Sequence, residues 1–214
     1  MNVLVVDDHP MTVSGYIESL SLKDLFAPSL SFTKAYSCEE AFSRLASHIA
    51  FDLAIIDHGL PPFAQENIFS GIDLARIIRQ RNPDCKIIII TAHTEVLIVY
   101  DIFKKVQPEG LIVKNDITPE NLPLTVLKII EGDTYQSPTV KSIIKEIWKK
   151  DLMVDDTNRQ ILLYLSKGYK IKKIEQTLML SISAIQRRIA QMKATFDVKE
   201  DSSLVEAATL QGFL

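Results

Sequence analysis

Four short apolar runs, each followed by a charged or hydroxyl side chain, constrain the fold of this chain more than any other feature. The runs and the residues after them are Val3–Val6 before Asp7 and Asp8, Leu53–Ile56 before Asp57, Ile87–Ile90 before Thr91, and Leu111–Val113 before Lys114. Unbroken apolar runs of this length are typical of strands buried on both faces of a parallel sheet. Open α/β sheets bind ligands at the carboxyl ends of their strands. We therefore expect these polar residues to form one site.

Each of these residues also has an ordinary explanation when it is taken alone. An Asp at a strand end is commonly a turn residue or a helix cap. A single Lys at such a position is usually solvated. The coincidence of five such residues at matching strand ends favours a ligand site over these explanations.

Strand and helix patterns alternate five times over residues 1–131. This alternation predicts a doubly wound, five-stranded parallel α/β sheet with helices on both faces. Ser37 and Glu40 predict a capping box at the start of one helix. Residues 132–152 are expected to form a linker with a helix. Residues 153–214 show four short helical windows and no strand pattern, which predicts a small all-α second domain.

Composition narrows the functional classes. The formal net charge of −3 gives no global signal for nucleic acid, so any such surface must be local. The two cysteines, Cys38 and Cys85, lie in no motif, which favours a reducing compartment and buried thiols. We see no signal peptide, and no apolar run approaches the roughly 20 residues of a membrane span. We therefore expect a soluble cytoplasmic protein that does not enter a membrane.

The strand-end acids suit phosphoryl transfer to a carboxylate. That reaction needs an accessible carboxylate, a divalent cation against the phosphoryl oxygens, and a fixed cation for the developing charge. Asp7 and Asp8 offer carboxylates for Mg²⁺ beside Asp57, and the backbone carbonyl of Gly59 is a further oxygen ligand. We predict Asp57 as the phosphoacceptor.

Two further strand-end residues suit a response to the phosphoryl group. Lys114 would pair with the phosphoryl oxygens, and the hydroxyl of Thr91 would hydrogen-bond them. Movement of both residues towards a phosphoaspartate would shift the loops after their strands.

Residues 1 to about 131 resemble the flavodoxin-like receiver domain of bacterial two-component response regulators. The matching pieces are Val6–Pro10, Asp57–Pro61, Thr91–His93 and Gly110–Asp116. The resemblance implies that a sensor histidine kinase phosphorylates Asp57. It also implies that Asp7, Asp8 and Asp57 hold Mg²⁺ and that Thr91 and Lys114 are the switch pair.

The chain departs from the receiver pattern at two places. Leu111 stands where many members carry a Tyr or Phe that reports phosphorylation, which questions the usual coupling to the output surface. The loop from Pro61 to Gly71 is several residues longer than usual, and it is either functional or a tolerated insertion. His9, His58 and His93 also lie near the strand ends and raise the alternative of a transition-metal site. The resemblance accounts for His9 and His93 without a metal.

The second domain contains a helix-turn-helix pattern. Residues 171–178 predict a first helix, residues 179–181 the turn with Ser181 as N-cap, and residues 182–193 a second helix. Ile185, Ile189 and Met192 are expected to face inward. The candidate DNA-contacting residues are Lys172, Lys173, Ser183, Gln186, Arg187, Arg188, Gln191 and Lys193. A solvated basic face on a helical bundle is the competing explanation.

Residues 154–214 resemble the LuxR-type DNA-binding domain that often follows a receiver. Framework positions match at Gly168, Ile174, Leu178, Leu180-Ser181, Ile185 and Val198. The departures are Asn158, Gln160 and Lys173 in place of usual acids, Ala184-Ile185-Gln186 in place of Thr-Val-Lys, and Arg188 in place of a common His. These changes make the face more basic, which favours contacts with DNA phosphates.

The last predicted helix, residues 203–211, carries Leu204, Val205 and Ala208. The resemblance implies that this helix pairs two copies on DNA half-sites. Packing within its own domain is the alternative.

These inferences predict a transcription-regulating response regulator that accepts a phosphoryl group but turns over no substrate. Three alternatives stay open: a DNA-binding regulator that needs no phosphorylation, a receiver that signals through protein contacts alone, and an aspartyl-phosphate phosphatase. The haloacid dehalogenase type of phosphatase needs a second Asp two residues after its nucleophile, where this chain has Gly59.

Overall fold

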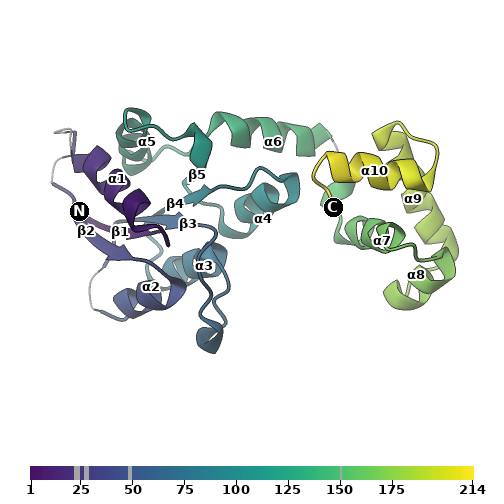
Figure 1. Cartoon of the computed structure of the whole chain (residues 1–214), viewed down its shortest axis with the longest axis horizontal. Helices are drawn as coiled ribbons and strands as arrows, with labels where there is room; N and C mark the ends of the chain where they lie inside the picture. The colour runs from purple at the N-terminus through teal and green to yellow at the C-terminus, as the bar shows by residue number, and fades with distance from the viewer. Residues whose placement is uncertain (22–24, 27–28, 48–49, 150) are drawn as a thin grey trace. The chain divides into compact units, whose positions relative to one another are not determined.

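A computed structural model describes residues 1–21, 25–26, 29–47, 50–149 and 151–214 (Figure 1). These residues form two compact units, the first comprising 1–94 and 101–141 and the second 95–100 and 142–214. The domain boundaries expected after residues 131 and 152 stay predictions.

One parallel sheet organises the first unit, with the strand order β2-β1-β3-β4-β5-β6. Its strands are β1 (Asn2–Val6), β2 (Ser31–Ala35), β3 (Leu53–Asp57), β4 (Lys86–Thr91), β5 (Gly110–Val113) and β6 (Tyr135–Gln136). The doubly wound α/β sheet is confirmed, but the expected number of five strands is wrong. The sixth strand, β6, lies in the segment expected to be a linker. Two residues are too few to show a hydrophobic pattern.

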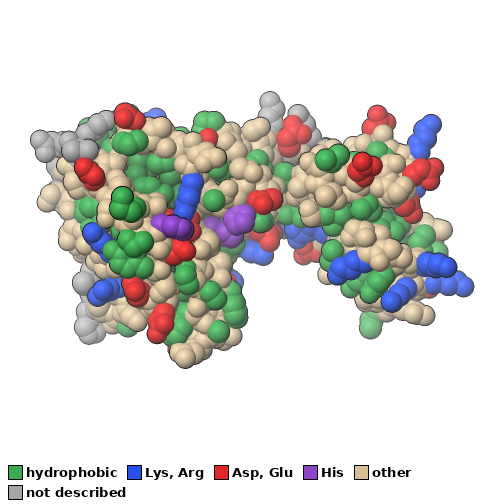
Figure 2. Space-filling view, in the orientation of Figure 1, with side chains coloured by type: hydrophobic (Ala, Val, Ile, Leu, Met, Phe, Trp, Pro, Cys, Tyr) green, Lys and Arg blue, Asp and Glu red, His purple; other side chains and the backbone are tan. Residues whose placement is uncertain are grey.

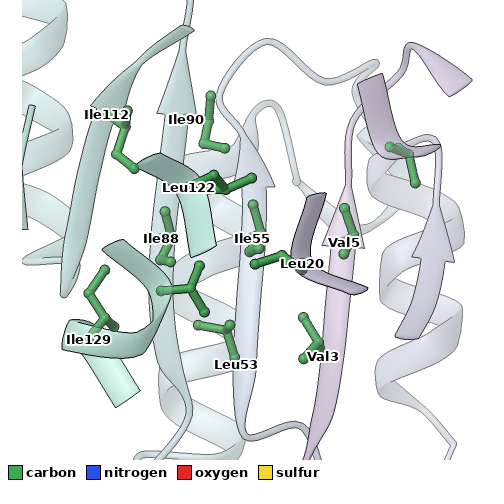
Figure 3. Packing of buried hydrophobic residues seen from close by; sticks show 12 residues of the cluster. Val3, Val5, Leu20, Leu53, Ile55, Ile88, Ile90, Ile112, Leu122 and Ile129 are labelled. Atoms are coloured by element: carbon green, nitrogen blue, oxygen red, sulfur yellow. The ribbon is translucent and has the colours of Figure 1, made fainter. Parts of the chain in front are cut away.

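Helices cover both faces of this sheet. They are α1 (Pro10–Ser21), α2 (Cys38–Leu45), α3 (Gly71–Arg81), α4 (Val96–Val106) and α5 (Asn121–Ile130). Helices α1 and α5 lie over one face, and α2 and α3 lie on the other side (Figure 1). Figure 3 shows Leu20 of α1 with Leu122 and Ile129 of α5, packed against every second side chain of the central strands. A fully buried aliphatic side chain of this size stabilises the fold by about 1.5–3 kcal/mol.

The start of α2 follows the predicted capping pattern with one difference. The Ser37 hydroxyl accepts a hydrogen bond from the Glu40 N–H at 3.1 Å. The Glu40 carboxylate accepts one from the N–H of Tyr36 at 3.0 Å, one residue before the N-cap position of a standard capping box. Both bonds satisfy backbone donors at the point where the chain enters the helix.

The long loop after β3 is an ordered element. It contains a 3₁₀ turn, η1 (Ala64–Glu66), and an antiparallel bridge in which Phe63 and Ile68 exchange backbone hydrogen bonds of 2.7 and 3.1 Å. Asn67 closes this turn in the left-handed conformation, with φ of 56°. The side chain of Ile68 is fully buried and fixes the loop to the first unit.

The second unit is helical, as the sequence predicts. It contains η3 (Asp151–Val154), α7 (Asp156–Ser166), α8 (Ile171–Leu178), α9 (Ile182–Phe196) and α10 (Asp201–Leu210). Helix α6 (Pro138–Lys149) passes from one unit to the other. Ile185, Ile189 and Met192 of α9 are buried, which confirms the inward face expected for the second helix of the helix-turn-helix. Ile161 of α7 and Ile174 of α8 belong to the same core.

Both cysteines are free and buried, as expected. Burial raises the pKa of Cys38 to about 11 and that of Cys85 to about 12. Neither thiol is therefore reactive at neutral pH. Among the residues that the structure describes, no helix has the length and apolar character needed to cross a membrane.

An ion pair at the amino edge of the sheet joins α3 to two strands. Arg79 donates to both carboxylate oxygens of Glu109 at 2.9 Å, and Glu109 also accepts from the backbone N–H of Ile87 at 2.8 Å. Burial raises the pKa of Glu109, but hydrogen bonds from Arg79 and Ile87 outweigh it and hold the pKa below its usual value.

Replacing Glu109 by Gln should reduce the free energy of unfolding of the first unit by about 2 kcal/mol at neutral pH, because hydrogen bonds to charged groups contribute about 1.5–3 kcal/mol. The folded-state pKa is depressed, so this stabilisation is complete above the unfolded pKa of about 4.3 and is lost as the pH falls through the folded pKa. Urea titrations at neutral pH and near pH 3 measure the effect. The exposed Glu66→Gln is the control, and an equal loss at both pH values would contradict the assignment.

Candidate functional site

Lysine 114 joins the ends of three strands at the carboxyl edge of the sheet. Its Nζ lies 2.9 Å from Oδ2 of Asp7, which follows β1, and 2.9 Å from Oδ1 of Asp57, which ends β3. The sheet order places β3 beside both β1 and β4, and β5 beside β4. The structure therefore brings the predicted acids and lysine together. Figure 2 shows acidic, basic and histidine side chains gathered on this part of the first unit.

The charges of this cluster are largely removed from water. Asp7 is 1% exposed and Asp57 is 5% exposed, so neither carboxylate is well solvated. Burial lowers the pKa of Lys114, but hydrogen bonds to Asp57 and Asp7 and their charges outweigh it and raise the pKa above its usual value. The ammonium group therefore stays charged and offsets the repulsion between the carboxylates.

The field of these carboxylates extends to a neighbouring helix. Burial, followed by the charges of Asp7 and Asp57, raises the pKa of Tyr16 in α1 far above its usual value. The sequence did not single out Tyr16, because its place in the helix gives no sign of this proximity. The site is negative enough to favour a cation.

Backbone contacts set the position of Asp57. The N–H of Gly59 donates to Oδ2 of Asp57 at 3.0 Å. Gly71 closes the long loop against the same strand, where a Cβ would lie only 2.1 Å from the backbone oxygen of Asp57. A glycine is required at position 71 because the two segments approach so closely. Coordination of a metal by the carbonyl of Gly59 stays a prediction.

Asp7, Asp8 and His9 are arranged to hold a cation. Each places a ligand atom within 4.8 Å of the others, and Nδ1 of His9 lies 2.6 Å from Oδ1 of Asp8. Asp8 is more exposed than Asp7, so the cluster opens towards solvent. Carboxylate oxygens are the ligands that Mg²⁺ prefers, and Mg²⁺ retains several waters in such sites. The carboxylates of Asp7 and Asp8 therefore fit the predicted cation, whereas Asp57, the third predicted carboxylate ligand, lies outside this cluster and pairs with Lys114.

Thr91 ends β4 and His93 follows it, while His58 follows Asp57 at the end of the neighbouring strand β3. The Thr91 side chain is fully buried, and its hydroxyl accepts a hydrogen bond from the N–H of His93 at 3.0 Å. The rings of His58 and His93 pack edge to face, with centroids 5.2 Å apart. Two of the three expected histidines, His58 and His93, are therefore in contact, whereas His9 pairs with Asp8. The Thr91 hydroxyl orients the loop after β4.

Leu111 is buried within the sheet. Its backbone pairs with Ile89 of β4 and Gln136 of β6, and its side chain is 1% exposed. An apolar side chain in this position offers no polar group to the site. Asp116, two residues after Lys114, accepts two hydrogen bonds from Thr139, a contact of which the sequence gives no sign.

In the second unit, the predicted DNA-contacting residues fall into two groups. Figure 2 shows basic side chains over α8 and α9. The exposed members of the predicted set are Lys172, Lys173, Ser183, Gln186, Arg187 and Gln191. Lys173 lies over the ring of Tyr169, with Nζ 4.0 Å from its centroid. These six side chains are therefore accessible on α8 and α9.

Arg188 and Lys193 are partly buried and have partners inside the unit. Nη1 of Arg188 donates to Asp155 at 2.9 Å and to Asn158 at 2.8 Å, and Lys193 pairs with Asp201 at 2.6 Å. Two departures from the LuxR-type pattern, Asn158 and Arg188, are therefore partners of each other. Burial raises the pKa of Asp155, but hydrogen bonds from Arg188, Asn158 and Thr157 outweigh it and lower the pKa.

The expected dimerisation residues require a correction. Leu204 and Ala208 are fully buried in the core of their own unit and cannot face a second copy. Val205 is partly exposed but also packs against this core. Leu210, near the end of the same helix, is 81% exposed. Apolar spacing in the sequence does not distinguish a core-facing stripe from a pairing surface.

The chain matches one family model and is similar over most of its length to known proteins. The family model described as the response regulator receiver domain matches residues 3–126. The oxygen regulatory protein NreC of Staphylococcus haemolyticus is 24% identical over 220 residues, covering 97% of this chain and 96% of its own. Two solved structures share the fold at 20% identity and a TM-score of 0.66. One shows RcsB of Salmonella enterica serovar Typhimurium bound to promoter rprA with a phosphomimetic and covers 100% of both chains. The other shows two RcsB dimers on two parallel DNAs and covers 98% of both chains.

Replacing either of two neighbouring arginines of α9 should change the free energy of unfolding to different extents. Arg188→Met removes the donor to the buried Asn158 and should lower the free energy of unfolding of the second unit by about 2 kcal/mol. Arg187→Met changes an exposed side chain and should stay within about 0.5 kcal/mol of the wild type. Urea denaturation of the full chain measures both. Equal stability of the two variants would show that the Arg188 contacts contribute nothing.

Proposed function

Since the chain belongs to the response regulators with a receiver domain, we propose that a sensor histidine kinase phosphorylates Asp57 and that the second unit regulates transcription by binding DNA. The observation that carries this proposal is the Lys114 ammonium group, 2.9 Å from both Asp7 and Asp57. It provides a fixed positive charge beside a carboxylate nucleophile, which is what phosphoryl transfer to Asp requires. We assign the protein to the cytoplasm, where both of its free thiols would remain reduced.

The chemistry begins with a carboxylate oxygen of Asp57. This oxygen attacks the phosphorus of a phosphohistidine, the P–N bond breaks as the P–O bond forms, and the imidazole leaves with the bonding electrons and takes up a proton. Bound Mg²⁺ would neutralise charge on the phosphoryl oxygens. Asp7, Asp8, Asp57 and the Gly59 carbonyl are the ligands that we propose for it.

Lys114 and Thr91 act on the product of this transfer. Lys114 exchanges its carboxylate partners for phosphoryl oxygens, which carry more negative charge than the free carboxylate. Thr91 donates its hydroxyl hydrogen to another phosphoryl oxygen, and its movement towards that oxygen weakens the hydrogen bond that it accepts from the N–H of His93. The loops after β4 and β5 thereby respond to phosphorylation.

The phosphoryl group is held as a signal and is not a step in turnover. A haloacid dehalogenase type of phosphatase would need an acid two residues after the nucleophile, and Gly59 supplies only backbone atoms there. The acid that such a phosphatase needs two residues after its nucleophile is therefore missing from this chain. We therefore propose no enzymatic activity.

DNA binding is assigned to the exposed polar face of α8 and α9. Gln186, Arg187 and Gln191 project from α9, the second helix of the helix-turn-helix, and suit contacts with base edges. Lys172 and Lys173 of α8 suit contacts with phosphates. The RcsB structures, solved on DNA with the same fold, support this assignment. Arg188 and Lys193 are left out because they have partners within the unit.

We propose that two copies bind DNA together. RcsB forms dimers on DNA, and a two-fold pair would match two half-sites. The buried Leu204 and Ala208 cannot supply the contact. The exposed Leu210 is an apolar residue of α10 that a second copy can reach, and Val205 is partly exposed on the same helix.

The phosphoacceptor is tested by intact mass spectrometry after incubation with Mg²⁺ and acetyl phosphate. The wild type should gain one phosphoryl group, and Asp57→Asn should gain none because an amide oxygen is a poor nucleophile. Lys114→Met should reduce the yield of phosphoprotein, since the fixed cation is lost.

Lys128→Met, which replaces an exposed lysine of α5, is the control. This variant should be phosphorylated on Asp57 like the wild type. A phosphoryl group on Asp57→Asn would place the acceptor elsewhere. A wild type that binds Mg²⁺ but gains no mass would favour a regulator that works without phosphorylation, in line with the buried Leu111.

The DNA-binding face is tested with genomic fragments selected by the wild-type protein. Arg187→Met should weaken binding by about tenfold, because a well-placed arginine contact contributes about 1–3 kcal/mol. Lys172→Met should reduce the slope of log affinity against log salt by about one unit, as expected for one lost phosphate contact. Lys128→Met should bind normally. Failure of the wild type to bind any fragment in either phosphorylation state would favour a receiver that signals through protein contacts.

A further inference from the structure

After α5 the chain turns back along the outer edge of the sheet. Gly132, with φ of 105°, makes the turn. The N–H of Tyr135 then donates to the Glu109 carbonyl at 2.7 Å, and the N–H of Ser137 donates to the Leu111 carbonyl at 3.0 Å. The fully buried Ser137 hydroxyl accepts from the N–H of Val113 at 3.2 Å. The segment before α6 is therefore attached to β5, the strand that leads directly into Lys114.

The carboxylate of Asp116, in the turn after β5, binds the start of α6. Thr139 donates its N–H and its hydroxyl to the two carboxylate oxygens of Asp116, each at 3.0 Å. The first N–H groups of a helix lack partners within the helix, and a negative charge there is favourable. Burial raises the pKa of Asp116, but hydrogen bonds from Ser137 and Thr139 outweigh it and lower the pKa. Asp116 therefore binds as a carboxylate at neutral pH.

Asp116 and Lys114 belong to one short turn. They are the two ends of η2 (Lys114–Asp116), which the N–H of Ile117 closes by donating to the Lys114 carbonyl at 3.2 Å. The Lys114 side chain contacts Asp57 at one end of this chain of contacts, and Asp116 contacts Thr139 at the other. A three-residue 3₁₀ turn has little freedom to move one end without the other.

We propose that the Asp116–Thr139 link transmits phosphorylation of Asp57 to helix α6, and that phosphorylation loosens it. This inference rests on the proposed function of Asp57. Lys114 bridges the carboxylates of Asp7 and Asp57. Phosphorylation converts the Asp57 carboxylate into a phosphoaspartate, and Asp7 would serve as a ligand of Mg²⁺. Lys114 follows the phosphoryl oxygens outward, η2 turns with it, and the Asp116 carboxylate leaves Thr139.

This route does not require an aromatic side chain at position 111. The buried leucine there has no polar group that could report on the phosphoryl group. Asp116 instead offers two charged hydrogen bonds whose loss changes the stability of the first turn of α6. Because α6 leads into the second unit, freeing its first turn alters how that unit is tethered.

Hydrogen exchange of the full chain, measured on peptides that cover residues 137–141, tests this inference. The backbone N–H groups of Thr139 and Lys141 are bonded to Asp116 and to the Ser137 carbonyl in this segment. Loss of the link corresponds to about 1.5 kcal/mol, so their exchange should accelerate by about tenfold when acetyl phosphate and Mg²⁺ phosphorylate the wild type. Asp116→Ala should show the fast exchange without phosphorylation, and phosphorylation should add nothing further.

Thr139→Val changes the other partner of the Asp116–Thr139 link and removes only the hydroxyl contact. It should give an intermediate exchange rate and a smaller response to phosphorylation. Asp84→Ala replaces an exposed carboxylate in the loop before β4 and should respond like the wild type. Combining Asp116→Ala with Thr139→Val should add little to Asp116→Ala alone, because both remove one interaction.

Intact mass measured on each sample separates this inference from the proposed function. A wild type that gains a phosphoryl group but keeps its slow exchange over residues 137–141 would overturn the coupling and leave the function of Asp57 standing. A phosphorylation response in Asp116→Ala as large as in the wild type would also overturn it. No gain in mass would overturn the proposed function, and the coupling with it.

Discussion

The first unit depends on one ammonium group placed between two buried carboxylates. Asp7 and Asp57 end separate strands and would repel each other in surroundings where water screens little. Leaving a buried charge without its partner typically costs about 3–5 kcal/mol. Lys114 supplies that partner and fixes the ends of β1, β3 and β5 relative to one another. The contact that stabilises the resting sheet is therefore the same one that a phosphoryl group must rearrange.

The two units use their polar contacts differently. In the first, Lys114 joins Asp7 and Asp57 at the carboxyl edge of the sheet, and the helices and strands below pack as a hydrophobic core (Figure 3). In the second, Arg188 joins α9 to Asp155 and Asn158 at the start of α7. This contact holds the helix that carries Arg187 and Gln186 against a neighbouring helix. Arg188 thus positions the helix, and the adjacent Arg187 is the residue that we propose for contact with DNA.

The sequence predicts those parts of the structure that depend on several residues acting together. Four apolar runs and the alternation of strand and helix patterns predict five strands, and the shared direction of these strands brings Asp7, Asp57 and Lys114 to one edge. Other features depend on one or two residues whose spatial neighbours the sequence does not show. The two-residue strand β6, the contact of Asp116 with Thr139 and the pairing of Arg188 with Asn158 belong to this class. Leu204 and Ala208 failed as dimerisation residues because helical spacing alone cannot reveal which apolar stripe is covered by its own core.

Strand β6 also has a consequence for how the receiver can be studied in isolation. Its backbone occupies the outer edge of β5, which would otherwise present open hydrogen-bonding groups. Exposed edge strands invite pairing with other chains and aggregation. A fragment cut after residue 131, where the repeating strand-and-helix pattern stops, would leave that edge bare. A fragment that extends through Thr139 would keep the edge closed and remain better suited to work at high concentration.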